Sequence, residues 1–318
     1  MVHAEPAPVW CLAANRQDSQ LIYAGSNECV AMGNARGMRT LARSSDGGKS
    51  WEDITPRGTA DEDTWTIAAS PVSPNQLFVG TSRGRILRSD DGGRTFAECT
   101  ALRAERARAK WEPGCGGRTP RVRSIAFDPR SPSTFYVAIE RGGILRSRDE
   151  GVSFEALSAA VHADVHSVAV SPYDSRLLFA ATGNGFYRSD NSGASWRRVL
   201  LDCTRSYTVP ILALSEPAGV ILTAAALGPP QTWAGPGGAR ARIFRSVDHG
   251  RTFTPVPLTL VEDPMPAMVM EIVQSPSCPQ EIFAITNRGF ALRSRDRGAT
   301  FTQVAASLPP AFSLVVLA

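Results

Sequence analysis

A nine-residue pattern that occurs six times constrains this chain more than any other feature. Each copy begins with Arg-Ser, has Gly at its sixth position and Ser or Thr at its eighth, and ends in an aromatic residue. The copies span residues 43–51, 88–96, 146–154, 188–196, 245–253 and 293–301. The Ser residues of consecutive copies are 45, 58, 42, 57 and 48 positions apart. A recurrence at this spacing indicates repeated supersecondary units, so the repeat has to be interpreted before any single motif.

The residue types within each copy are those of a tight β-hairpin turn. Asp and Ser side chains accept backbone N–H bonds, and Gly adopts the positive φ that such a turn needs. The fourth copy has Asn in place of Asp, and its amide oxygen can do the same work. A catalytic carboxylate would not occur six times, so we interpret the residues at the fourth position as structural. They are Asp46, Asp91, Asp149, Asn191, Asp248 and Asp296. The Arg that opens each copy is expected to bind a carboxylate or a carbonyl between repeats.

A second shared pattern precedes most copies. Residues 122–147 align with 64–89, with 165–189 and, more loosely, with 269–294. Each segment reads as an apolar strand, a turn with Pro, a strand of β-branched and aromatic residues, a Gly turn and a third strand that ends at Arg-Ser. The hairpin then leads into a fourth strand, and four antiparallel strands make one propeller blade. The sequence therefore predicts an all-β fold, a single β-propeller with six four-stranded blades and the hairpins on one rim, with seven blades as the alternative.

We predict one domain over residues 1–318. Its blades cover about 9–60, 61–110, 118–160, 161–204, 207–260 and 265–310. Two insertions, at about 101–120 and 224–242, account for the longer spacings. The apolar tail 311–318 is predicted to be a strand that closes the ring, or the remnant of a seventh blade.

The nine-residue pattern resembles the Asp-box, or BNR, repeat of sialidase-like β-propellers, and the resemblance covers essentially the whole chain. The companion pattern also resembles bacterial relatives of the photosystem II assembly factor. The resemblance implies that the hairpins lie on the rim remote from the functional face. It does not extend to catalysis, because the Arg-Ile-Pro element of sialidases is absent and only Tyr207 is placed like their site tyrosine. Xyloglucan-cleaving relatives have two propellers, and this chain has room for one.

Composition and charge exclude several function classes. The 34 Lys and Arg residues are interleaved with 30 Asp and Glu residues, which argues against a nucleic-acid partner. No apolar run is long enough for a transmembrane helix. The first residues lack the features of a secretory signal, which leaves a cytoplasmic location and, after removal of a signal, a periplasmic or secreted one both open.

The six cysteines form no CxxC pair and show no zinc-ligand spacing. We therefore expect buried thiols. The pairs that could instead form disulfides are Cys11 with Cys29 and Cys99 with Cys115, since each pair could flank one loop.

The richest candidate site is the stretch 161–168, "VHADVHSV", which leads into a predicted first strand. His162, Asp164 and His166 alternate, so on a strand they would share one side. Such a set can provide an acid and a base for catalysis or bind a divalent metal. The alternative is a polar, solvated loop.

Other candidate ligand-binding residues are predicted at the same face. Three arginines precede or begin the third blade and could hold a carboxylate or phosphate; they are Arg118, Arg121 and Arg123. Four further candidates lie near the starts of other first strands; they are Asp63, Trp65, Tyr207 and Glu271.

Two functions remain open from the sequence. The missing sialidase pattern favours a non-catalytic propeller that binds a partner protein or a small acidic or carbohydrate ligand at the face opposite the hairpins. It would need no cofactor, and ring closure predicts a monomer because it removes free sheet edges. The alternative is a hydrolase or lyase in which His162, Asp164 and His166 act as acid and base or hold a divalent metal. Arg121 and Arg123 would then bind an anionic substrate.

Overall fold

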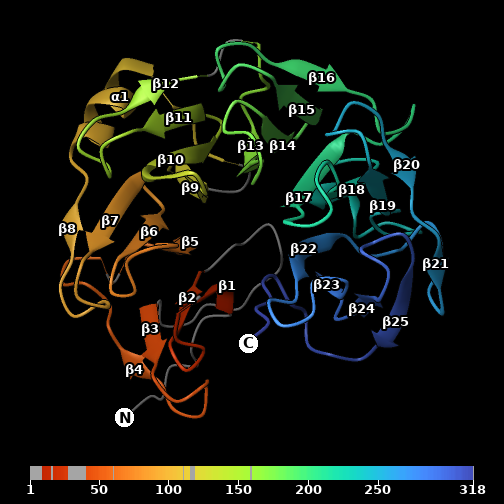
Figure 1. Cartoon of the computed structure of the whole chain (residues 1–318), viewed down its shortest axis with the longest axis horizontal. Coiled ribbons are helices and arrows are strands. Elements are labelled where there is room, and N and C mark those ends of the chain that lie inside the picture. The colour runs from red at the N-terminus through yellow and green to blue at the C-terminus, as the bar shows by residue number, and fades with distance from the viewer. Residues whose placement is uncertain are drawn as a thin grey trace. The chain divides into compact units, whose positions relative to one another are not determined.

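The computed structural model describes residues 9–15, 17–27, 41–59, 61–109, 111–114, 119–157 and 160–317. In these ranges the strands form six sheets, and the single α-helix is α1 (Ala101–Ala109) (Figure 1). The fold class is the predicted one, an all-β β-propeller of six four-stranded blades. The chain divides into two compact units, Met1–Ala156 and Leu157–Ala318. The assignment of residues 1–318 to a single domain stays a prediction.

The first unit holds three blades, each an antiparallel meander in chain order. The first blade is β1 (Val9–Ala14), β2 (Ile22–Ser26), β3 (Leu41–Ser44) and β4 (Glu52–Asp53). The second is β5 (Thr64–Ala69), β6 (Leu77–Thr81), β7 (Arg85–Ser89) and β8 (Ala97–Glu98). The third is β9 (Arg121–Asp128), β10 (Ser131–Glu140), β11 (Gly143–Ser147) and β12 (Glu155–Ala156).

The second unit also holds three blades. The fourth blade is β13 (Val165–Val170), β14 (Leu178–Thr182), β15 (Gly185–Ser189) and β16 (Arg197–Val199). The fifth is β17 (Tyr207–Ala213), β18 (Ile221–Ala226), β19 (Arg242–Ser246) and β20 (Thr254–Pro255), with the short helix η2 (Pro230–Thr232) in its insertion. The sixth is β22 (Val269–Gln274), β23 (Ile282–Thr286), β24 (Ala291–Ser294) and β25 (Phe301–Ala305). A short strand β21 (Leu258–Thr259) pairs in parallel with β25.

The core of each unit lies between neighbouring blades. The second strands are buried on both faces, which is why they read as continuous apolar runs in the sequence. In the first unit Phe78 of β6 packs on Phe135 of β10, with ring centroids 4.9 Å apart. In the second unit Phe186 of β15 packs on Phe253 in the same way, at 4.9 Å. The aromatic and β-branched residues of the repeat thus form the packing between sheets.

All six nine-residue motifs are hairpins between the third and fourth strands of a blade. Each hairpin contains the same pattern of internal hydrogen bonds. In the third copy Ser147 Oγ donates to Asp149 Oδ1 at 2.8 Å, and the Gly151 amide donates to Ser147 Oγ at 2.8 Å. The amide and hydroxyl of Ser153 donate to the two oxygens of Asp149 at 2.9 and 2.5 Å. The other Asp copies repeat these bonds. In the Asn copy the Asn191 amide instead donates to Ser195 Oγ at 2.9 Å.

Four of the arginines that open the motifs donate a hydrogen bond to the neighbouring blade. In the first unit, Arg43 donates to the Gly92 carbonyl at 2.8 Å and Arg88 donates to the Glu150 carbonyl at 3.2 Å. In the second unit, two further bonds of this kind join Arg188 to the His249 carbonyl at 2.7 Å and Arg245 to the Arg297 carbonyl at 3.2 Å. Each accepting carbonyl belongs to the fifth position of the next motif. The predicted structural role is confirmed for these four arginines.

The predicted closing strand at 311–318 is wrong for the residues described. Residues 311–317 contain no strand. Their apolar side chains suggested one, but the segment instead lies beside β22, where Ser313 and Leu314 bind the side chain of Glu271. Apolar composition therefore predicted the burial of this segment and not its conformation.

The structure describes four of the six cysteines. Cys11 and Cys99 are buried, Cys203 is exposed and Cys278 is partly exposed. Burial raises the pKa of the Cys99 thiol to about 11, as expected for an inert core cysteine. The proposed disulfide partners Cys29 and Cys115 lie outside the described residues. No helix in the described ranges is long and apolar enough to span a membrane.

Candidate functional site

Every blade has two ends with different chemistry. The hairpin end carries the nine-residue motif and the turn between the first and second strands. The loop end carries the segment that leads into the first strand and the connection between the second and third strands. Because the hairpin motifs are structural, the loop end is where variable, function-bearing side chains can lie.

A β-bulge lies near the loop end of the first strand in all six blades. In five blades one residue of the first strand is left out of the pairing with the second strand. In the fifth blade two consecutive residues of the first strand lie opposite a single residue of the second strand. The bulged residues are Trp10, Trp65, Arg123, His166, Val209 with Pro210, and Met270. A bulge turns a side chain away from the regular alternation of the strand, and bulges are frequent beside active sites. The sequence had made Trp65, Arg123 and His166 candidate site residues without indicating that they are bulged.

In the first unit the bulged side chains form a buried cluster of indoles and guanidinium groups. The rings of Trp10 and Trp65 have centroids 4.8 Å apart. Arg121 lies 4.3 Å and Arg123 4.8 Å from the Trp65 ring, and Arg121 pairs with Glu140 at 3.2 Å. The side chains of Arg121 and Arg123 are 7% and 12% exposed. These two arginines are therefore brought together, but as part of a packed and charge-paired cluster rather than an open anion clamp. Arg118 lies outside the described residues.

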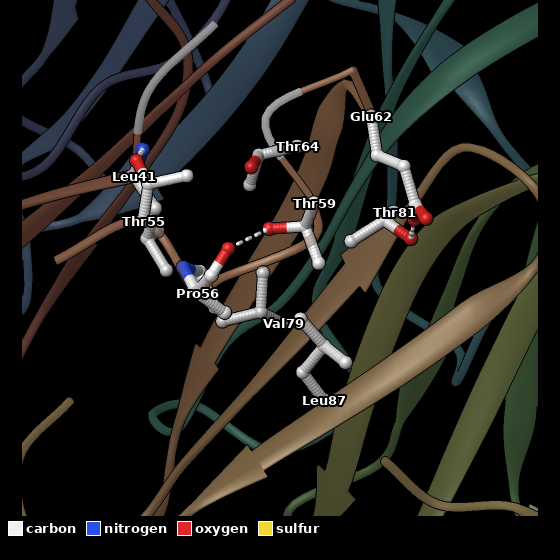
Figure 2. Close-up of a pocket in the computed structure, with 9 residues that line it drawn as sticks. All are labelled: Leu41, Thr55, Pro56, Thr59, Glu62, Thr64, Val79, Thr81 and Leu87. Atoms are coloured by element: carbon white, nitrogen blue, oxygen red, sulfur yellow. Dashed lines mark hydrogen bonds between the residues drawn. The ribbon is translucent and has the colours of Figure 1, made fainter. Parts of the chain in front are cut away.

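The acidic segment before β5 is also held in structural contacts. A small pocket in the first unit is lined by nine residues, among them Thr59, Glu62 and Thr81 (Figure 2). Glu62 is fully buried; one of its oxygens accepts from Thr81 Oγ1 at 2.7 Å, and the other pairs with Arg85. The backbone of Asp63, a predicted ligand-binding residue, is hydrogen-bonded to Ser82 in both directions. The carboxylate that lines the pocket, Glu62, is therefore already paired with an arginine.

In the second unit an imidazole is oriented from both sides. His166 Nδ1 lies 2.6 Å from the Thr208 carbonyl, and because a carbonyl only accepts, Nδ1 carries the proton. The other nitrogen, Nε2, faces Asp164 Oδ1 at 3.4 Å. The His166 side chain is 1% exposed, whereas Asp164 is 27% exposed. Nε2 can donate to the Asp164 carboxylate only when it is protonated as well, and Asp164 is the member of the pair that solvent or a substrate can reach.

Gly183 fixes the other side of Asp164. The Gly183 amide donates to the Asp164 carbonyl at 2.8 Å. A Cβ at residue 183 would lie 2.3 Å from Asp164 Oδ2. The connection between β14 and β15 therefore needs Gly at this position so that the carboxylate can lie against the backbone.

The alternation predicted for 162–166 is only partly realised. β13 begins at Val165, so His162 and Asp164 lie in the preceding loop and His166 lies on the strand. His162 Nδ1 accepts from the Asp164 amide at 3.3 Å, which turns the ring back on its own loop. Among the described residues no three His, Cys, Asp or Glu side chains are grouped to hold a metal ion. The set therefore provides a carboxylate–imidazole pair and not a gathered metal site.

Two aromatic rings extend the contacts of His166 into the fifth blade. The ring of Tyr207 lies 4.6 Å from the His166 ring, and Trp233 lies 5.8 Å from Tyr207. Trp233 comes from the insertion of the fifth blade, where its indole N–H donates to the Gly228 carbonyl at 2.8 Å. Sequence reasoning missed Trp233. A tryptophan within a Gly- and Pro-rich insertion at the predicted functional face was the available signal.

Glu271 is the residue after the bulge of β22. Its Oε2 accepts from Ser313 Oγ and from the Leu314 amide, both at 2.6 Å. Burial raises the pKa of the Glu271 carboxyl to about 7, although the two hydrogen bonds act in the opposite direction. The second unit thus contains a carboxyl group that is largely protonated below neutral pH and another, Asp164, that is partly exposed.

Comparison with known proteins relates the chain to carbohydrate-cleaving propellers. A xyloglucanase of Hypocrea jecorina is 28% identical over 268 residues, which are 79% of this chain and 27% of that protein. A xyloglucanase of Acetivibrio thermocellus is 28% identical over 43% of this chain and 20% of its own length. The chain thus spans about a quarter of the length of the curated relatives it matches. No family model matches the chain.

Solved structures agree on the fold. A GH74 xyloglucanase from Xanthomonas campestris has a TM-score of 0.67 at 15% identity, covering 96% of this chain and 46% of that chain. YCF48 bound to a D1 peptide has a TM-score of 0.59 at 15% identity, covering 95% and 85%. At this identity the likeness establishes the propeller fold and no more.

The prediction of a non-catalytic binding propeller is contradicted by the xyloglucanase relatives. Their similarity favours the hydrolase alternative instead. The non-catalytic interpretation rested on the missing sialidase pattern and on the room for one propeller where xyloglucan-cleaving relatives have two, and neither observation excludes an active site. Propellers present unrelated chemistries on the same scaffold, and one missing motif does not exclude the others.

Proposed function

We propose that this chain is a glycoside-hydrolase propeller that acts on xyloglucan or a related β-glucan. The observation that carries the proposal is the 28% identity with a fungal xyloglucanase over 79% of the chain. We further propose that the six hairpin motifs are Asp-box repeats, which would make the hairpin end the structural end of an Asp-box propeller. The loop end of the second unit would then supply the acid and base.

Hydrolysis of a glycosidic bond needs two carboxyl groups in different states. One is protonated and donates its proton to the leaving oxygen, and the other is ionised and activates water or attacks the sugar. Environments that separate the pKa values of two carboxyl groups provide this division of roles. The raised pKa of the Glu271 carboxyl suits the protonated role, and we assign the ionised role to Asp164, whose side chain is 27% exposed.

Glu271 is the proposed proton donor. With its pKa near 7 the carboxyl holds a proton in neutral and mildly acidic solution. A donor must be protonated to act, so activity is expected to fall as the pH rises through about 7.

Asp164 is the proposed base. Its carboxylate is held between the Gly183 backbone and His166, and His166 is in turn fixed by the Thr208 carbonyl. His166 would act as a positioning residue in the form in which Nε2 is also protonated and donates to Asp164. The partly exposed ring of Tyr207 beside His166 offers an apolar face to a sugar ring.

The test is the release of reducing ends from xyloglucan by the purified chain, with cellulose as an unbranched substrate for comparison. Asp164→Asn and Glu271→Gln should each lower kcat/KM by about 100-fold or more, because each removes one half of the acid and base pair. The matched control is Asp174→Asn. Asp174 lies at the hairpin end of the same blade as Asp164, where it pairs with Arg176 at 2.9 Å.

Asp174→Asn should retain full activity. The proposal is wrong if the folded wild-type chain releases no reducing ends from either glucan. The assignment of the two carboxyl groups is wrong if both active-site variants retain wild-type rates.

A further inference from the structure

We propose that the C-terminal segment 311–317 is a strap that positions the Glu271 carboxyl and governs when it releases its proton. For its link to activity the inference rests on the proposed function, but the strap itself can be tested without a substrate.

In two other blades, the residue at the position of Glu271 contacts the first strand of a neighbouring blade. In the first blade the equivalent residue is Cys11, whose Sγ lies 3.8 Å from the Thr64 carbonyl at the start of β5. In the fourth blade it is Ser167, whose hydroxyl donates to the Val209 carbonyl of β17 at 2.7 Å. Both side chains are donors that meet a backbone carbonyl.

In the sixth blade the donor and acceptor roles are exchanged. Glu271 is an acceptor, and the groups it meets are the hydroxyl of Ser313 and the amide of Leu314. The contact that β1 and β13 each make with the first strand of a neighbouring blade is therefore made in β22 with the segment 311–317. This segment offers hydrogen-bond donors to Glu271, whereas the neighbouring strands offer carbonyl acceptors. An irregular segment can do this because its amides are not committed to a β ladder.

The strap both covers the carboxyl and stabilises its charge. Phe312 is buried, and the side chains of residues 313–317 are partly buried and uncharged. Burial penalises the carboxylate, while two short hydrogen bonds to one oxygen stabilise it.

Few other groups compete for this control. Within the described residues of the second unit, β17, β18 and β23 pack against β22, and Tyr207 at the start of β17 is the titratable side chain on these three strands. Neither β22 itself nor the segment 311–317 carries another. Among these described elements, the hydrogen bonds that bear on the protonation of Glu271 come from the strap.

Ser313 is the positioning residue to change. Ser313→Ala removes one hydrogen bond to the charged form and leaves the apolar cover, so Glu271 should bind its proton about tenfold more tightly. Ser313→Thr keeps the hydroxyl and should behave like the wild type. Ser307→Ala is the matched control, since Ser307 is an exposed residue that follows β25 and precedes the strap.

The experiment is a carboxyl ¹³C NMR titration of Glu271 in the full chain, without substrate, alongside the pH profile of xyloglucan hydrolysis. Ser313→Ala should raise the midpoint of the titration by about one pH unit and move the alkaline limit of activity equally. Thermal melts check that each variant is folded.

The proposal that the strap controls the protonation of Glu271 is wrong if the midpoint is unchanged in folded Ser313→Ala. It is also wrong if Ser307→Ala shows the same shift as Ser313→Ala. A raised midpoint with an unmoved alkaline limit would support the strap and refute Glu271 as the proton donor. The two proposals therefore fail in different measurements.

Discussion

The two ends of the blades repeat in different ways. At the hairpin end the same side chains make the same bonds six times, with one substitution at Asn191. At the loop end the backbone device, the bulge, also occurs six times, but its side chain is Trp in two blades and Arg, His, Val with Pro, or Met in the others. One end repeats residues and the other repeats only geometry.

The difference has a physical cause. The fifth and sixth residues of every hairpin have positive φ, between 56° and 73° and between 75° and 92°, and the turn is closed by specific side-chain oxygens. The sixth position is Gly in all six copies, whereas the fifth is Gly, Glu, Ser, His or Arg, so the restriction on residue type falls on the sixth residue and on the side chains that close the turn. A bulge requires only that one residue is left out of the hydrogen-bonded ladder, so it does not restrict the type of side chain at that position.

The largest effect should come from a glycine at the loop end. Gly183→Ala places a Cβ 2.3 Å from Asp164 Oδ2, so the carboxylate must move. We expect kcat/KM for xyloglucan to fall about 100-fold, since displacement of a catalytic group by about 1 Å has this cost. Gly235→Ala is the control, because its Cβ would meet nothing closer than 3.6 Å. Full activity in Gly183→Ala would mean that Asp164 is not the base.

A glycine at the hairpin end should instead affect stability. Gly93→Ala places a Cβ at φ +86° and 2.6 Å from Ile54 Cδ1, so strain and overpacking add, and unfolding free energy should fall by about 2–4 kcal/mol. The neighbouring Gly92 has φ +73° with no atom closer than 3.7 Å, and Gly92→Ala should cost only about 1–2 kcal/mol. Denaturant unfolding measures both. Equal losses would show that packing does not distinguish the fifth and sixth positions.

The smallest effect should come from making the six hairpins alike. Asn191→Asp restores the carboxylate of the other copies, and the melting temperature at pH 7 should rise by at most about 2 °C because the site is exposed. Hydrogen bonds from Ser50 and Ser44 lower the pKa of Asp46 from 3.8 to about 2. A group with a lowered pKa stabilises the fold above its unfolded pKa, so the gain should disappear as the pH falls from about 4 toward 2. A gain that persists at pH 2 would contradict this explanation.

The sequence predicted the hairpin end well. The six nine-residue motifs were predicted to be hairpins that lead into a fourth strand, and each of them lies between the third and fourth strands of its blade. At the loop end it identified Asp164, His166 and Glu271 as candidates. It did not show that His162 turns away, that the two arginines are buried against Trp65, or that Trp233 joins the site.

The sequence by itself determined the repeat, the number of blades and the role of the hairpin motif, because every bond in a hairpin joins residues at most four positions apart. The tertiary structure decided which loop-end groups work together. Thr208 fixes His166 from 42 residues away, and Ser313 binds Glu271 across the same separation. A local pattern carries no information about such contacts, because they form only when separate strands are placed side by side.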